Sequence, residues 1–564
     1  MYGIGEVCSL LGIKPHILRY WEKEIPLLAP KKNRAGRRIY AKKDLQTLLR
    51  LKHLVYERKY TLQGAREKIW EEIQAADPNV VSRIAEIKDE LLRINAIVRK
   101  RAGDPMKESA VMDEMIERGQ GHLFRNWEQR SESQKRLLLD DLAGLEASYF
   151  DLISEAVHAA AAGPRSLEPV DYVPISETRN DRRLLGIGEE FIRSGGWAFA
   201  TVAGGQGSRL GFDGPKGMYP ISPVRRASLY QLFSEKLLGA NRKYGVAAPW
   251  YIMTSPLNHE QTLEFFEASD FFGLDRGLVH FFPQRLLASF DTSGKLIQAA
   301  GGGLFKNPDG HGGLVAALRR HGMIEDMRDR GIRELFTFQV DNPLVNVPDP
   351  VFLGKHLEEG SQASSKVIEK AYPEEKLGVI ARVDGKPTVV EYSDLSRENM
   401  YARDAGGKLL YSQGSIAIHL FSVGFLADEE LELPFHTARK KVEALNAEDP
   451  ANGTVEKEAV KLETFIFDLI PQARKALFFE TEREEEFAPL KNKTGRDSVE
   501  TCIRGQVEKA ARRLSRCGVE VPRNQEGKPL YNLEISPLFA MDEASLREKT
   551  AAQELTINGD TLLE

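Results

Sequence analysis

Short apolar runs alternate with segments of helical length through the middle of the chain. Four runs rich in aromatic and β-branched residues predict buried strands: WAFATVA (197–203), PWYIMTS (249–255), LVHFFPQ (278–284) and LFTFQV (335–340). Between them lie stretches such as SLYQLFSEKLLGANRKYG and LNHEQTLEFFEAS. This alternation predicts an α/β fold whose mostly parallel sheet is covered by helices on both faces. Ligands of such sheets gather at the carboxyl ends of strands, so the residues after each run are the first candidates for a site.

A different pattern occupies the first 60 residues. Apolar residues recur at helical spacing within 7–11 and within 17–21, and Gly12 separates the two groups. This predicts a helix, a tight turn and a second helix. In KKNRAGRRIY (31–40), Ala35-Gly36 interrupts two cationic segments, which predicts a strand pair that forms a wing. Further helices are expected at 42–60 and from Thr61 onward.

A possible dimer seam follows. Ile84, Ile87, Leu91, Ile94 and Val98 step by three and four residues, the spacing of a coiled coil and therefore of a homodimer interface. Only about two heptads are visible, fewer than a coiled coil needs. An amphipathic helix packed on its own domain explains the spacing equally well. RAGDP (101–105) then ends the helical pattern and marks a linker.

Length, charge and cysteine content narrow the class of protein. A chain of 564 residues is too long for one core, so two to four domains are expected. Residues 1–60 carry a net charge of +9 and the rest −14, which favours a polyanion-binding head on a body that does not bind nucleic acid. Three scattered cysteines offer neither a disulfide framework nor a zinc cluster. No apolar run has the length of a membrane span and no secretion signal is visible, so the expected location is cytoplasmic.

The richest candidate site is the stretch GGQGSRLGFDGPK, which follows the first central strand. Gly204, Gly205 and Gly207 lack β-carbons, so their backbone N–H groups can point at an anion. Arg209 and Lys216 add full positive charges. A Walker loop requires Gly-Lys-Ser/Thr, but Pro215 precedes Lys216 here, and a dinucleotide fingerprint requires glycine at position 210, which is Leu. An ATPase and a dehydrogenase are therefore both disfavoured.

The first 73 residues resemble the DNA-binding domain of MerR-type winged-helix regulators. The resemblance is carried by IGEVCSLLGI, LRYWEKE and NRAGRRIYAKKDL, in that order. It implies that Arg19 and Tyr20 on the recognition helix face double-stranded DNA, together with Arg34, Arg37 and Arg38 on the wing. Arginines that grip phosphates give an affinity that depends on salt and carries no sequence information.

Residues from about 115 to 540 resemble the eukaryotic-type UDP-N-acetylhexosamine pyrophosphorylases, which are sugar-nucleotide pyrophosphorylases. GGQGSRLGFDGPK carries the signature, and further blocks follow in family order, including GQGHLFRNW, VDNPLVNVPDP, LPFHTARKK, VKLETFIFDLI and REEEFAPLKN. The resemblance implies a Rossmann-like nucleotidyltransferase core with a mostly parallel, mixed sheet. The expected parts are a winged helix-turn-helix (1–75), a helical linker (76–105), a helical N-terminal part of the pyrophosphorylase (106–185), the catalytic core (186–500) and a small β-rich C-terminal domain (501–564).

The family reaction transfers a uridylyl group from UTP to a sugar 1-phosphate and releases pyrophosphate. Positioning and charge neutralisation dominate such chemistry, so no protein nucleophile is required. The resemblance assigns the catalytic cations to Arg209, Lys216 and Lys461, and the nucleotide contacts to Gly204, Gly205, Gly207, Gln284 and Gly312. It also assigns the sugar contacts to Glu391, Tyr392 and Ser415, and Mg²⁺ to Asp341, which follows the strand LFTFQV.

Two departures from the family pattern lie on the sugar side. His311 stands where the family usually carries Asn, and Ser415 also replaces an expected Asn. The identity of the sugar is therefore open among N-acetylhexosamines and hexoses. His311 receives no catalytic role, since it is equally well explained as a packing histidine. An alternative for the whole protein is a MerR-type regulator that senses sugar nucleotides and has an inactive pyrophosphorylase fold. Retention of Arg209, Lys216, Asp341 and Lys461 favours the enzyme, because a sensor does not need cations for a leaving group.

Overall fold

The computed structural model describes residues 105–158, 166–446, 453–552 and 555–564, together with scattered residues among the first 64. The chain divides into two compact units, Met1–Pro105 and Met106–Glu564, and each is described by itself. The finer division into five parts stays a prediction from the sequence.

The first unit contains a small antiparallel sheet and a helix. Its three strands, in the order β1-β3-β2, are β1 (Tyr2–Gly3), β2 (Lys31–Lys32) and β3 (Arg38–Tyr40). Helix α3 (Lys42–Lys52) follows. One core buries the apolar residues Val7, Ile13, Leu18, Trp21, Tyr40, Leu48, Leu51 and Leu54. The helical spacing of the sequence therefore marked residues that do pack together, and the cationic stretch does form a strand pair.

Most of the residues predicted to contact DNA fall outside this description. Arg19, Tyr20, Arg34 and Arg37 are not among the described residues, and Arg38 is described only as part of the backbone of β3. The possible coiled-coil seam at 84–98 also lies outside the described residues. DNA contact and dimerisation therefore stay predictions.

A ten-stranded mixed sheet forms the centre of the second unit. Its parallel half joins β10 (Glu334–Gln339), β5 (Trp197–Val202), β6 (Trp250–Thr254) and β7 (Val279–Pro283) in that spatial order. These are the four strands that the apolar runs predicted. On the other side, β14 (Gln413–Ser422) runs antiparallel to β10 and carries the remaining strands: β4 (Leu167–Glu168), β11 (Ala363–Glu369), β12 (Val379–Val383), β13 (Lys386–Val390) and β17 (Ala476–Glu480).

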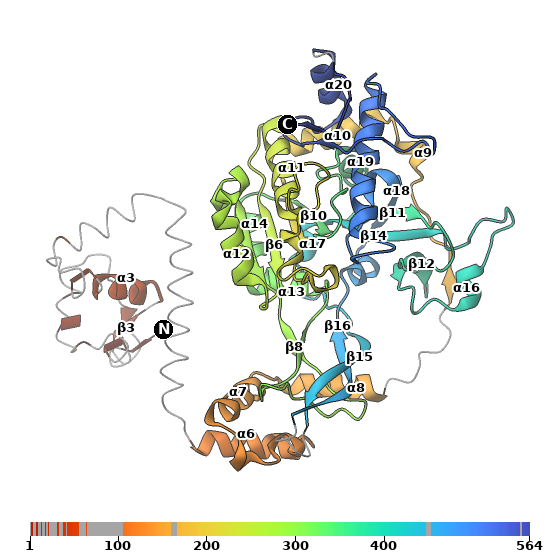
Figure 1. The fold of residues 1–564 in the computed structure, drawn as a ribbon. Helices are drawn as coiled ribbons and strands as arrows, with labels where there is room; N and C mark the ends of the chain where they lie inside the picture. The colour runs from red at the N-terminus through yellow and green to blue at the C-terminus, as the bar shows by residue number, and fades with distance from the viewer. Residues whose placement is uncertain are drawn as a thin grey trace. The chain divides into compact units, whose positions relative to one another are not determined.

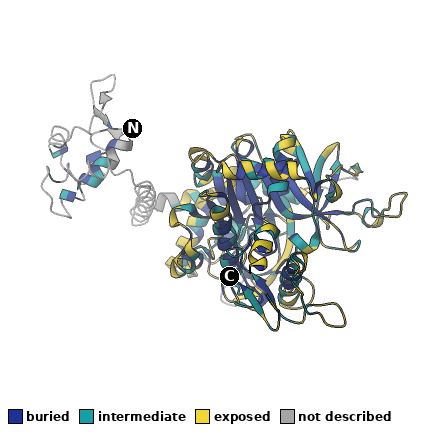
Figure 2. Ribbon diagram, turned by 90° about the horizontal axis from the view of Figure 1, so that it is seen from above, coloured by how far each residue is buried: buried dark blue, intermediate teal, exposed yellow. Residues whose placement is uncertain are grey.

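Helices cover both faces of this sheet, as the apolar runs require. One face packs against α10 (Arg182–Arg193), α11 (Leu229–Tyr244), α12 (His259–Ala268) and α15 (Pro350–Glu359). The other face packs against α13 (Gly313–Arg320), α14 (Met323–Asp329) and α17 (Val423–Leu426). Figure 2 shows buried strands between helices whose outer sides are exposed. The shorter helices α9 (Ile175–Thr178) and α16 (Arg397–Tyr401) lie in connecting segments.

Side-chain caps and left-handed residues set the ends of several helices. Ser228 caps α11 by accepting a hydrogen bond from the Gln231 N–H, and Gly245 ends the helix with φ +68°. Asp349 accepts from two N–H groups at the start of α15, where Pro350 occupies the first helical position. None of the described helices combines the length and the apolar character needed to cross a bilayer.

Three helices near the start of the second unit pack against two strand pairs, one short and one long. The helices are α6 (Pro105–Glu117), α7 (Glu132–Ala143) and α8 (Ala147–His158). The strand pairs are β8 (Leu286–Ala288) with β9 (Lys306–Pro308), and β15 (His436–Leu445) with β16 (Thr454–Glu463). Figure 1 shows the strand pairs reaching from the sheet to these helices, and a shared apolar core includes Leu138, Ile153, Phe290 and Val460.

The C-terminal region is mainly helical, which corrects the expected β-rich domain. After α18 (Arg483–Glu486) it contains α19 (Val499–Arg516) and α20 (Glu543–Ala551). Among its described residues are only two three-residue parallel strands, β18 (Leu533–Ile535) and β19 (Thr561–Leu563). The reason is packing on α19. Leu514 and Ala511 of α19 share a core with Leu533, Leu546 and Leu563. The two short strands therefore cover one side of α19 and do not form a sheet with a core of its own.

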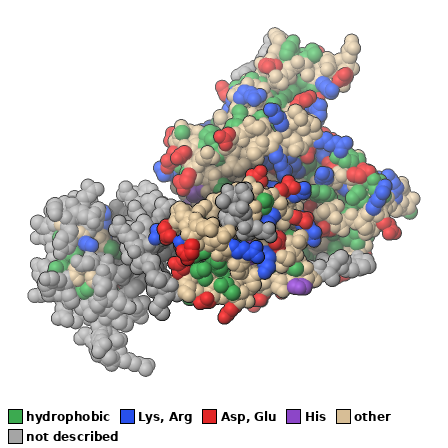
Figure 3. Space-filling view, turned by 60° about the horizontal axis from the view of Figure 1, so that its bottom comes forward, with side chains coloured by type: hydrophobic (Ala, Val, Ile, Leu, Met, Phe, Trp, Pro, Cys, Tyr) green, Lys and Arg blue, Asp and Glu red, His purple; other side chains and the backbone are tan. Residues whose placement is uncertain are grey.

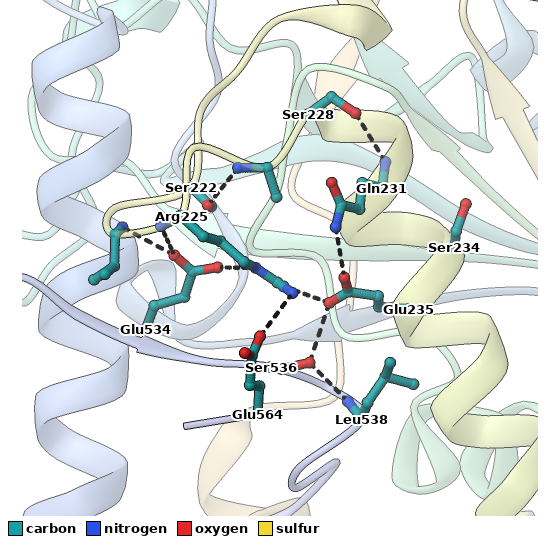
Figure 4. Close-up of polar contacts among 12 residues, drawn as sticks. Ser222, Arg225, Ser228, Gln231, Ser234, Glu235, Glu534, Ser536, Leu538 and Glu564 are labelled. Carbon is teal, nitrogen blue, oxygen red and sulfur yellow. Dashed lines mark hydrogen bonds and ion pairs between the residues drawn. The ribbon is translucent and has the colours of Figure 1, made fainter. Parts of the chain in front are cut away.

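An arginine-centred cluster fastens this region to the core. Arg225 donates from Nε to the carboxylate of Glu534 at 2.7 Å and also contacts the carboxylate of Glu235 on α11. The backbone N–H groups of Val224 and Arg225 donate to Glu534 as well, and Ser536 donates to Glu235. Figure 4 shows the two carboxylates on either side of the guanidinium. The side chains of Glu235 and Glu534 are only 5% exposed, so the C-terminal region is part of the folded unit.

Candidate active site

Two predicted site residues meet at the carboxyl edge of the parallel strands. β5 and β10 are neighbours in register, with Val202 opposite Gln339, so the segments that follow them share one edge of the sheet. Lys216 follows β5 and Asp341 follows β10, and the Lys216 Nζ lies 3.3 Å from the Asp341 Oδ2. Both side chains are largely buried, with 18% and 12% exposed. The fold therefore brings together the predicted catalytic lysine and the predicted metal ligand.

The glycine-rich loop lies directly beside this pair. The Lys216 N–H donates to the Gly205 carbonyl, and Asn258 Nδ2 donates to the carbonyls of Ala203 and Gly205. Among the residues that the structure describes, the N–H groups of Gly204 and Gly205 have no acceptor. Two amides at the carboxyl end of β5 are thus available to an anion.

The third glycine corrects the expectation that all three amides face the ligand. The Gly207 N–H donates to the Gly214 carbonyl at 2.8 Å and closes the loop on itself. A β-carbon at Gly207 would also lie 2.8 Å from Phe212 Cδ1. Gly207 is therefore required for a close approach within the loop, and its amide is already used.

Gln284, predicted to contact the base, lies against Gly204. A β-carbon on Gly204 would lie 3.3 Å from Gln284 Oε1. Gln284 is 5% exposed, and its N–H donates to the Thr254 carbonyl at the end of β6. Arg209 lies on a short 3-10 helix, Ser208–Leu210, is exposed, and has no ion pair with a described residue. Lys216 is thus fixed in place while Arg209 is free to reach a ligand.

Asp341 is also held through its backbone. The Leu490 N–H donates to the Asp341 carbonyl at 2.8 Å. The next residue, Asn342, donates to the Glu486 carbonyl and accepts from the Ala488 N–H. Glu486 in turn joins a buried charge cluster. These contacts hold the segment Asp341-Asn342 against residues 486–490.

The buried charge cluster centres on Lys366 of β11. Its Nζ lies 2.5 Å from Glu486 Oε1 and 2.6 Å from Asp349 Oδ2, and its side chain is fully buried. Burial lowers the pKa of Lys366, but the two carboxylates more than offset this and the pKa is raised. The cluster links β11, the start of α15 and Glu486, whose backbone carbonyl also contacts Asn342 next to Asp341.

Gly312 and His311 precede α13 and pack against Thr464 and Phe465. The Gly312 N–H donates to the Thr464 carbonyl, and a β-carbon there would lie 2.6 Å from the Thr464 carbonyl carbon. His311 Nδ1 accepts from the Ile466 N–H at 3.1 Å, and its ring stacks on Phe465 at 5.2 Å. Burial, aided by the nearby charge of His436, lowers the pKa of His311 to about 4. His311 is therefore neutral and has a backbone partner.

The predicted sugar contacts lie on the antiparallel half of the sheet. Ser415 is on β14, and its N–H donates to the Gly378 carbonyl. A β-carbon on Gly378 would lie 3.6 Å from Glu391 Oε1, so Glu391 and Ser415 flank the same glycine. Burial and then the charge of Asp394 raise the pKa of Glu391. Tyr392, the neighbour of Glu391, is 39% exposed.

Lys461 lies on a hairpin face that carries one residue missed from the sequence, His436, which in turn contacts a second, Asp468. Its Nζ lies 2.6 Å from Glu463 Oε1 on β16. His436 of β15 is directly opposite Glu463, so Lys461, Glu463 and His436 share one face of the hairpin. His436 Nε2 lies 2.8 Å from Asp468 Oδ2. His436 lies in LPFHTARKK and Asp468 in VKLETFIFDLI. Both segments carry the family resemblance, but nothing within them singled out these two residues.

The pKa of His436 reflects opposing causes. Burial lowers it, but the hydrogen bond and charge of Asp468, with Asp394 and Glu391, raise it overall. The imidazole also lies 4.5 Å from the ring of Phe465, measured between centroids. Phe465 thus lies between His436 and His311. The predicted sugar side therefore has an imidazole whose protonated form is favoured by Asp468, next to the aromatic surface of Phe465.

No ready-made metal cluster is present in the described part of the chain, where no three His, Cys, Asp or Glu side chains converge. Asp341 offers one carboxylate, whose Oδ2 accepts a hydrogen bond from Lys216. Mg²⁺ at a nucleotide is typically held by one or two protein carboxylates, phosphate oxygens and water. A single carboxylate beside a predicted triphosphate site fits that requirement.

The sequence and the fold are similar to those of known proteins. A family model described as UTP–glucose-1-phosphate uridylyltransferase matches residues 194–497, and one described as MerR HTH family regulatory protein matches residues 2–71. The UDP-N-acetylhexosamine pyrophosphorylase-like protein 1 of Mus musculus is 37% identical, covering 75% of this chain and 90% of the relative. UDP-N-acetylglucosamine diphosphorylase 2 of Arabidopsis thaliana is 36% identical, covering 68% and 80%. The uridine diphosphate N-acetylglucosamine pyrophosphorylase structure from Trypanosoma brucei superposes with a TM-score of 0.68 at 26% identity, covering 81% and 98%.

Proposed function

The chain belongs to the UDP-N-acetylhexosamine pyrophosphorylase family, and we propose that it transfers a uridylyl group from UTP to a sugar 1-phosphate and releases pyrophosphate. One observation carries the proposal most directly. Lys216 and Asp341, distant in sequence, meet within 3.3 Å at the strand edge where Gly204 and Gly205 leave two amides free. Such an edge offers what a triphosphate needs: amides, a cation and a carboxylate for a metal.

The proposed step is a single displacement at phosphorus. A phosphate oxygen of the sugar 1-phosphate attacks the α-phosphorus of UTP, and the bond from that phosphorus to the pyrophosphate oxygen breaks. The attacking group is already an anion, so no side chain has to accept a proton or act as nucleophile. The protein contributes alignment and charge neutralisation, which dominate such transfers.

Each residue of the triphosphate side receives one role. The free amides of Gly204 and Gly205 donate to phosphate oxygens, and Gln284 beside them both donates to and accepts from the uracil edge. Lys216 and Arg209 neutralise the negative charge that grows on the departing pyrophosphate. The triphosphate and Asp341 compete for the single ammonium group of Lys216. We therefore expect Lys216 to move from Asp341 to the triphosphate when UTP binds.

Pyrophosphorylases of this family use a divalent metal, and we assign Mg²⁺ to the Asp341 carboxylate. When bound, the metal supplies positive charge to the phosphate oxygens. The contacts of Leu490 and Asn342 hold the Asp341 backbone in place for this role. Before substrate binds, the positive charge of Lys216, 3.3 Å away, balances the negative charge of the Asp341 carboxylate.

The sugar 1-phosphate is assigned to the side formed by Glu391, Tyr392, Ser415 and Lys461. Lys461 contacts the phosphate next to the sugar, and Glu391 accepts hydrogen bonds from sugar hydroxyls. The substrate is an N-acetylhexosamine or a hexose 1-phosphate. The relatives' names favour the N-acetylhexosamine, whereas Ser415, in place of the expected Asn, leaves the hexose open.

The direct test combines UTP, Mg²⁺ and a panel of sugar 1-phosphates and measures pyrophosphate release. Turnover with any sugar is expected and excludes the inactive sensor. Binding of UTP without turnover of any sugar in the panel would favour the sensor instead. Omission of Mg²⁺ should abolish release, and its addition should restore it.

We further propose that the N-terminal unit binds double-stranded DNA. The match of residues 2–71 to the MerR family model and the net charge of +9 in residues 1–60 support this role. Binding of the full chain to duplex DNA should weaken as salt rises, because phosphate-gripping arginines release counterions. Replacing Arg34, Arg37 and Arg38 together by Gln should reduce the salt slope. A salt-independent signal would instead indicate that the unit docks another protein.

A further inference from the structure

The segment that follows Asp341 is buried although it has no regular secondary structure. Residues 341–349 form neither a helix nor a strand, and Leu344 and Val345 are 3% and 0% exposed. Pro343 has no backbone N–H to donate. The carbonyl groups of such a segment need hydrogen-bond donors from elsewhere in the molecule, because an unpaired buried carbonyl is unfavourable.

Two lysines supply donors to three consecutive carbonyls of this segment. Lys236 Nζ donates to the carbonyls of Pro343 and Val345, both at 2.6 Å. Lys509 Nζ donates to the Leu344 carbonyl between them at 2.9 Å. Lys236 lies on α11 and Lys509 on α19, so two helices that are far apart in the sequence hold the same three residues.

The partners of these two lysines are backbone carbonyls. Lys509 also donates to the Glu485 carbonyl at 2.6 Å, and within the described residues neither lysine forms an ion pair. On the face drawn in Figure 3, by contrast, basic and acidic side chains are interspersed. Lys243, on the same helix as Lys236, lies 2.5 Å from the carboxylate of Asp542. A carbonyl orients an ammonium group but supplies no full negative charge, so charge pairing does not explain Lys236 and Lys509.

The burial of these two ammonium groups is unfavourable for stability. Burial lowers the pKa of Lys236 well below its ordinary value, and the charge of Lys509 lowers it further. Burial also lowers the pKa of Lys509 to about 8, although the charges of Glu486 and Glu485 oppose this. Because desolvation is costly, buried charged groups can often be replaced by apolar side chains of similar volume at little cost in stability. Stability alone therefore does not account for lysines at these two positions.

We propose that Lys236 and Lys509 position the Asp341 carboxylate by holding the backbone of residues 343–345. Only one residue separates Asp341 from that segment. A displacement of the segment would therefore move the carboxylate relative to the Lys216 ammonium group, 3.3 Å away. An ammonium group suits this role because its three N–H donors can reach two carbonyls at once. The inference rests on the proposed uridylyl transfer, in which Asp341 is the metal ligand.

The same two helices also contact the segment that follows Lys216. Gln506 Nε2 of α19 donates to the Ile221 carbonyl at 3.1 Å. A β-carbon on Gly217 would lie 2.2 Å from the ring of Tyr230 on α11, so the backbone at Gly217 packs directly on that helix. Each helix therefore contacts both of the segments that follow the two members of the ion pair. Lysines on these helices can thus set the separation of the two side chains.

The variants Lys236→Met and Lys509→Met test this role. Methionine is apolar and of similar length, but it donates no hydrogen bond. We expect kcat for pyrophosphate release to fall about tenfold or more, because a small misplacement of a group that acts in the transition state is costly. KM for UTP should change little, since the amides of Gly204 and Gly205 are unaffected. Tm should also change little, because relief of the unfavourable burial offsets the lost hydrogen bonds.

Lys243→Met is the matched control on α11. Lys243 has a carboxylate partner, Asp542, and lies outside the candidate active site. Its replacement should lower Tm and leave kcat unchanged, which is the reverse of the pattern expected for the two positioning lysines. Arg504→Gln, at an exposed position of α19, should change neither quantity. A kcat in Lys236→Met and Lys509→Met equal to that of the wild type, or an equal fall of kcat in Lys243→Met, would overturn the proposal.

Amide hydrogen exchange tests the positioning without any turnover. The Asn346 N–H donates to the Glu486 carboxylate at 2.9 Å, so its exchange reports opening of the segment. Exchange of residues 342–346 should be slow in the wild type and about tenfold faster in Lys236→Met and Lys509→Met, while exchange of β10 is unchanged.

This measurement also separates the positioning from the proposed reaction. A wild type without turnover would contradict the proposed function, and the exchange rates would then decide the positioning alone. Rapid exchange of residues 342–346 in the wild type, or equal rates in the wild type and both methionine variants, would overturn it. The wild-type rate decides the question if neither variant folds.

Discussion

On the triphosphate side of the candidate site, the predicted residues directly follow neighbouring parallel strands, whereas on the sugar side they come from antiparallel strands and loops. Gly204, Gln284 and Asp341 follow β5, β7 and β10, and the sheet brings these strand ends to one edge. Ser415 and Lys461 instead lie within β14 and β16, and their neighbours come from other segments. Strand order therefore determines the first group, and side-chain packing determines the second.

This difference predicts how each side responds to substitution. The triphosphate side depends on a few full charges and free amides, so removing one of them should affect the chemical step strongly. The sugar side distributes its contacts over Glu391, Ser415, His436 and Lys461, so single changes there should be smaller and confined to the sugar 1-phosphate. Substitutions on each side therefore test that division.

The largest effect is expected from Lys216→Ala. Lys216 is the cation beside Asp341, and it is assigned to the charge that develops on pyrophosphate. Removing such a charge-stabilising group lowers kcat by about 10²–10³-fold. Steady-state pyrophosphate release measures kcat, and circular dichroism checks that the fold is retained. Lys386→Ala, an exposed lysine on β13, serves as the matched control and should be unaffected. A near-native kcat in Lys216→Ala would place the triphosphate elsewhere.

A smaller effect is expected from Gly204→Ala. The added methyl group would lie 3.3 Å from the amide oxygen of Gln284, whose buried side chain must then shift. Overpacking of this kind costs about 1–2 kcal/mol, so KM for UTP should rise about tenfold while KM for the sugar 1-phosphate is unchanged.

Gly186→Ala is the control for that variant. Gly186 lies in α10, and no neighbouring side chain comes within 4 Å of the position that an added methyl group would take. Its kinetic constants should equal those of the wild type. An unchanged KM for UTP in Gly204→Ala would show that Gln284 does not contact the nucleotide.

The sequence predicted the parallel half of the sheet well, because each strand there is a continuous apolar run. β5, β6, β7 and β10 lie where WAFATVA, PWYIMTS, LVHFFPQ and LFTFQV predict them. The C-terminal region was predicted less well. Its short strands pack on α19, and this packing depends on residues far apart in the chain, which local patterns do not reveal.

The contrast between local patterns and long-range packing also explains which parts of the candidate site the sequence predicted. The position of Gly204 and Asp341 just after strands is a local property, and this made the edge where Lys216 meets Asp341 predictable. The pairing of His436 with Asp468 depends on the hairpin register that places His436 opposite Glu463. Ladder register depends on the hydrophobic pattern and the turn geometry of the whole hairpin. Asp468 lies beyond the hairpin strands, so neither residue stood out. The use of the Gly207 amide within its own loop was likewise invisible in the sequence.

A moderate effect is expected from Asp468→Asn on the sugar side. Asp468 raises the pKa of His436, so the imidazolium persists to higher pH than an ordinary histidine. We expect the charged ring to attract the sugar phosphate, since it shares a hairpin face with Lys461. In the wild type, KM for the sugar 1-phosphate should rise as pH increases through that raised pKa. In Asp468→Asn the rise should begin at lower pH, with a loss of about three- to tenfold near neutrality.

The readout for that variant separates a local from a general effect. KM for UTP should keep its wild-type pH profile, because Gln284 and the glycine loop lie on the other side of the site. Asp151→Asn, an exposed aspartate on α8, is the matched control. Identical pH profiles for the sugar 1-phosphate in wild type and Asp468→Asn would remove His436 from the substrate site.

The smallest effect is expected from Ser415→Asn, which restores the residue that the family resemblance leads one to expect. Ser415 is half-buried, and its N–H donates to Gly378, the glycine that also lies beside Glu391. An amide here adds one donor and one acceptor near the sugar, worth about 0.5–1 kcal/mol, so the preference for N-acetylglucosamine 1-phosphate over glucose 1-phosphate should change by about two- to fivefold. The ratio of the two kcat/KM values measures this. Ser415→Ala lacks the amide and should leave the ratio unaltered. If both variants shift the ratio equally, loss of the hydroxyl explains the change, and the sugar-side packing around β14 determines selectivity without an amide.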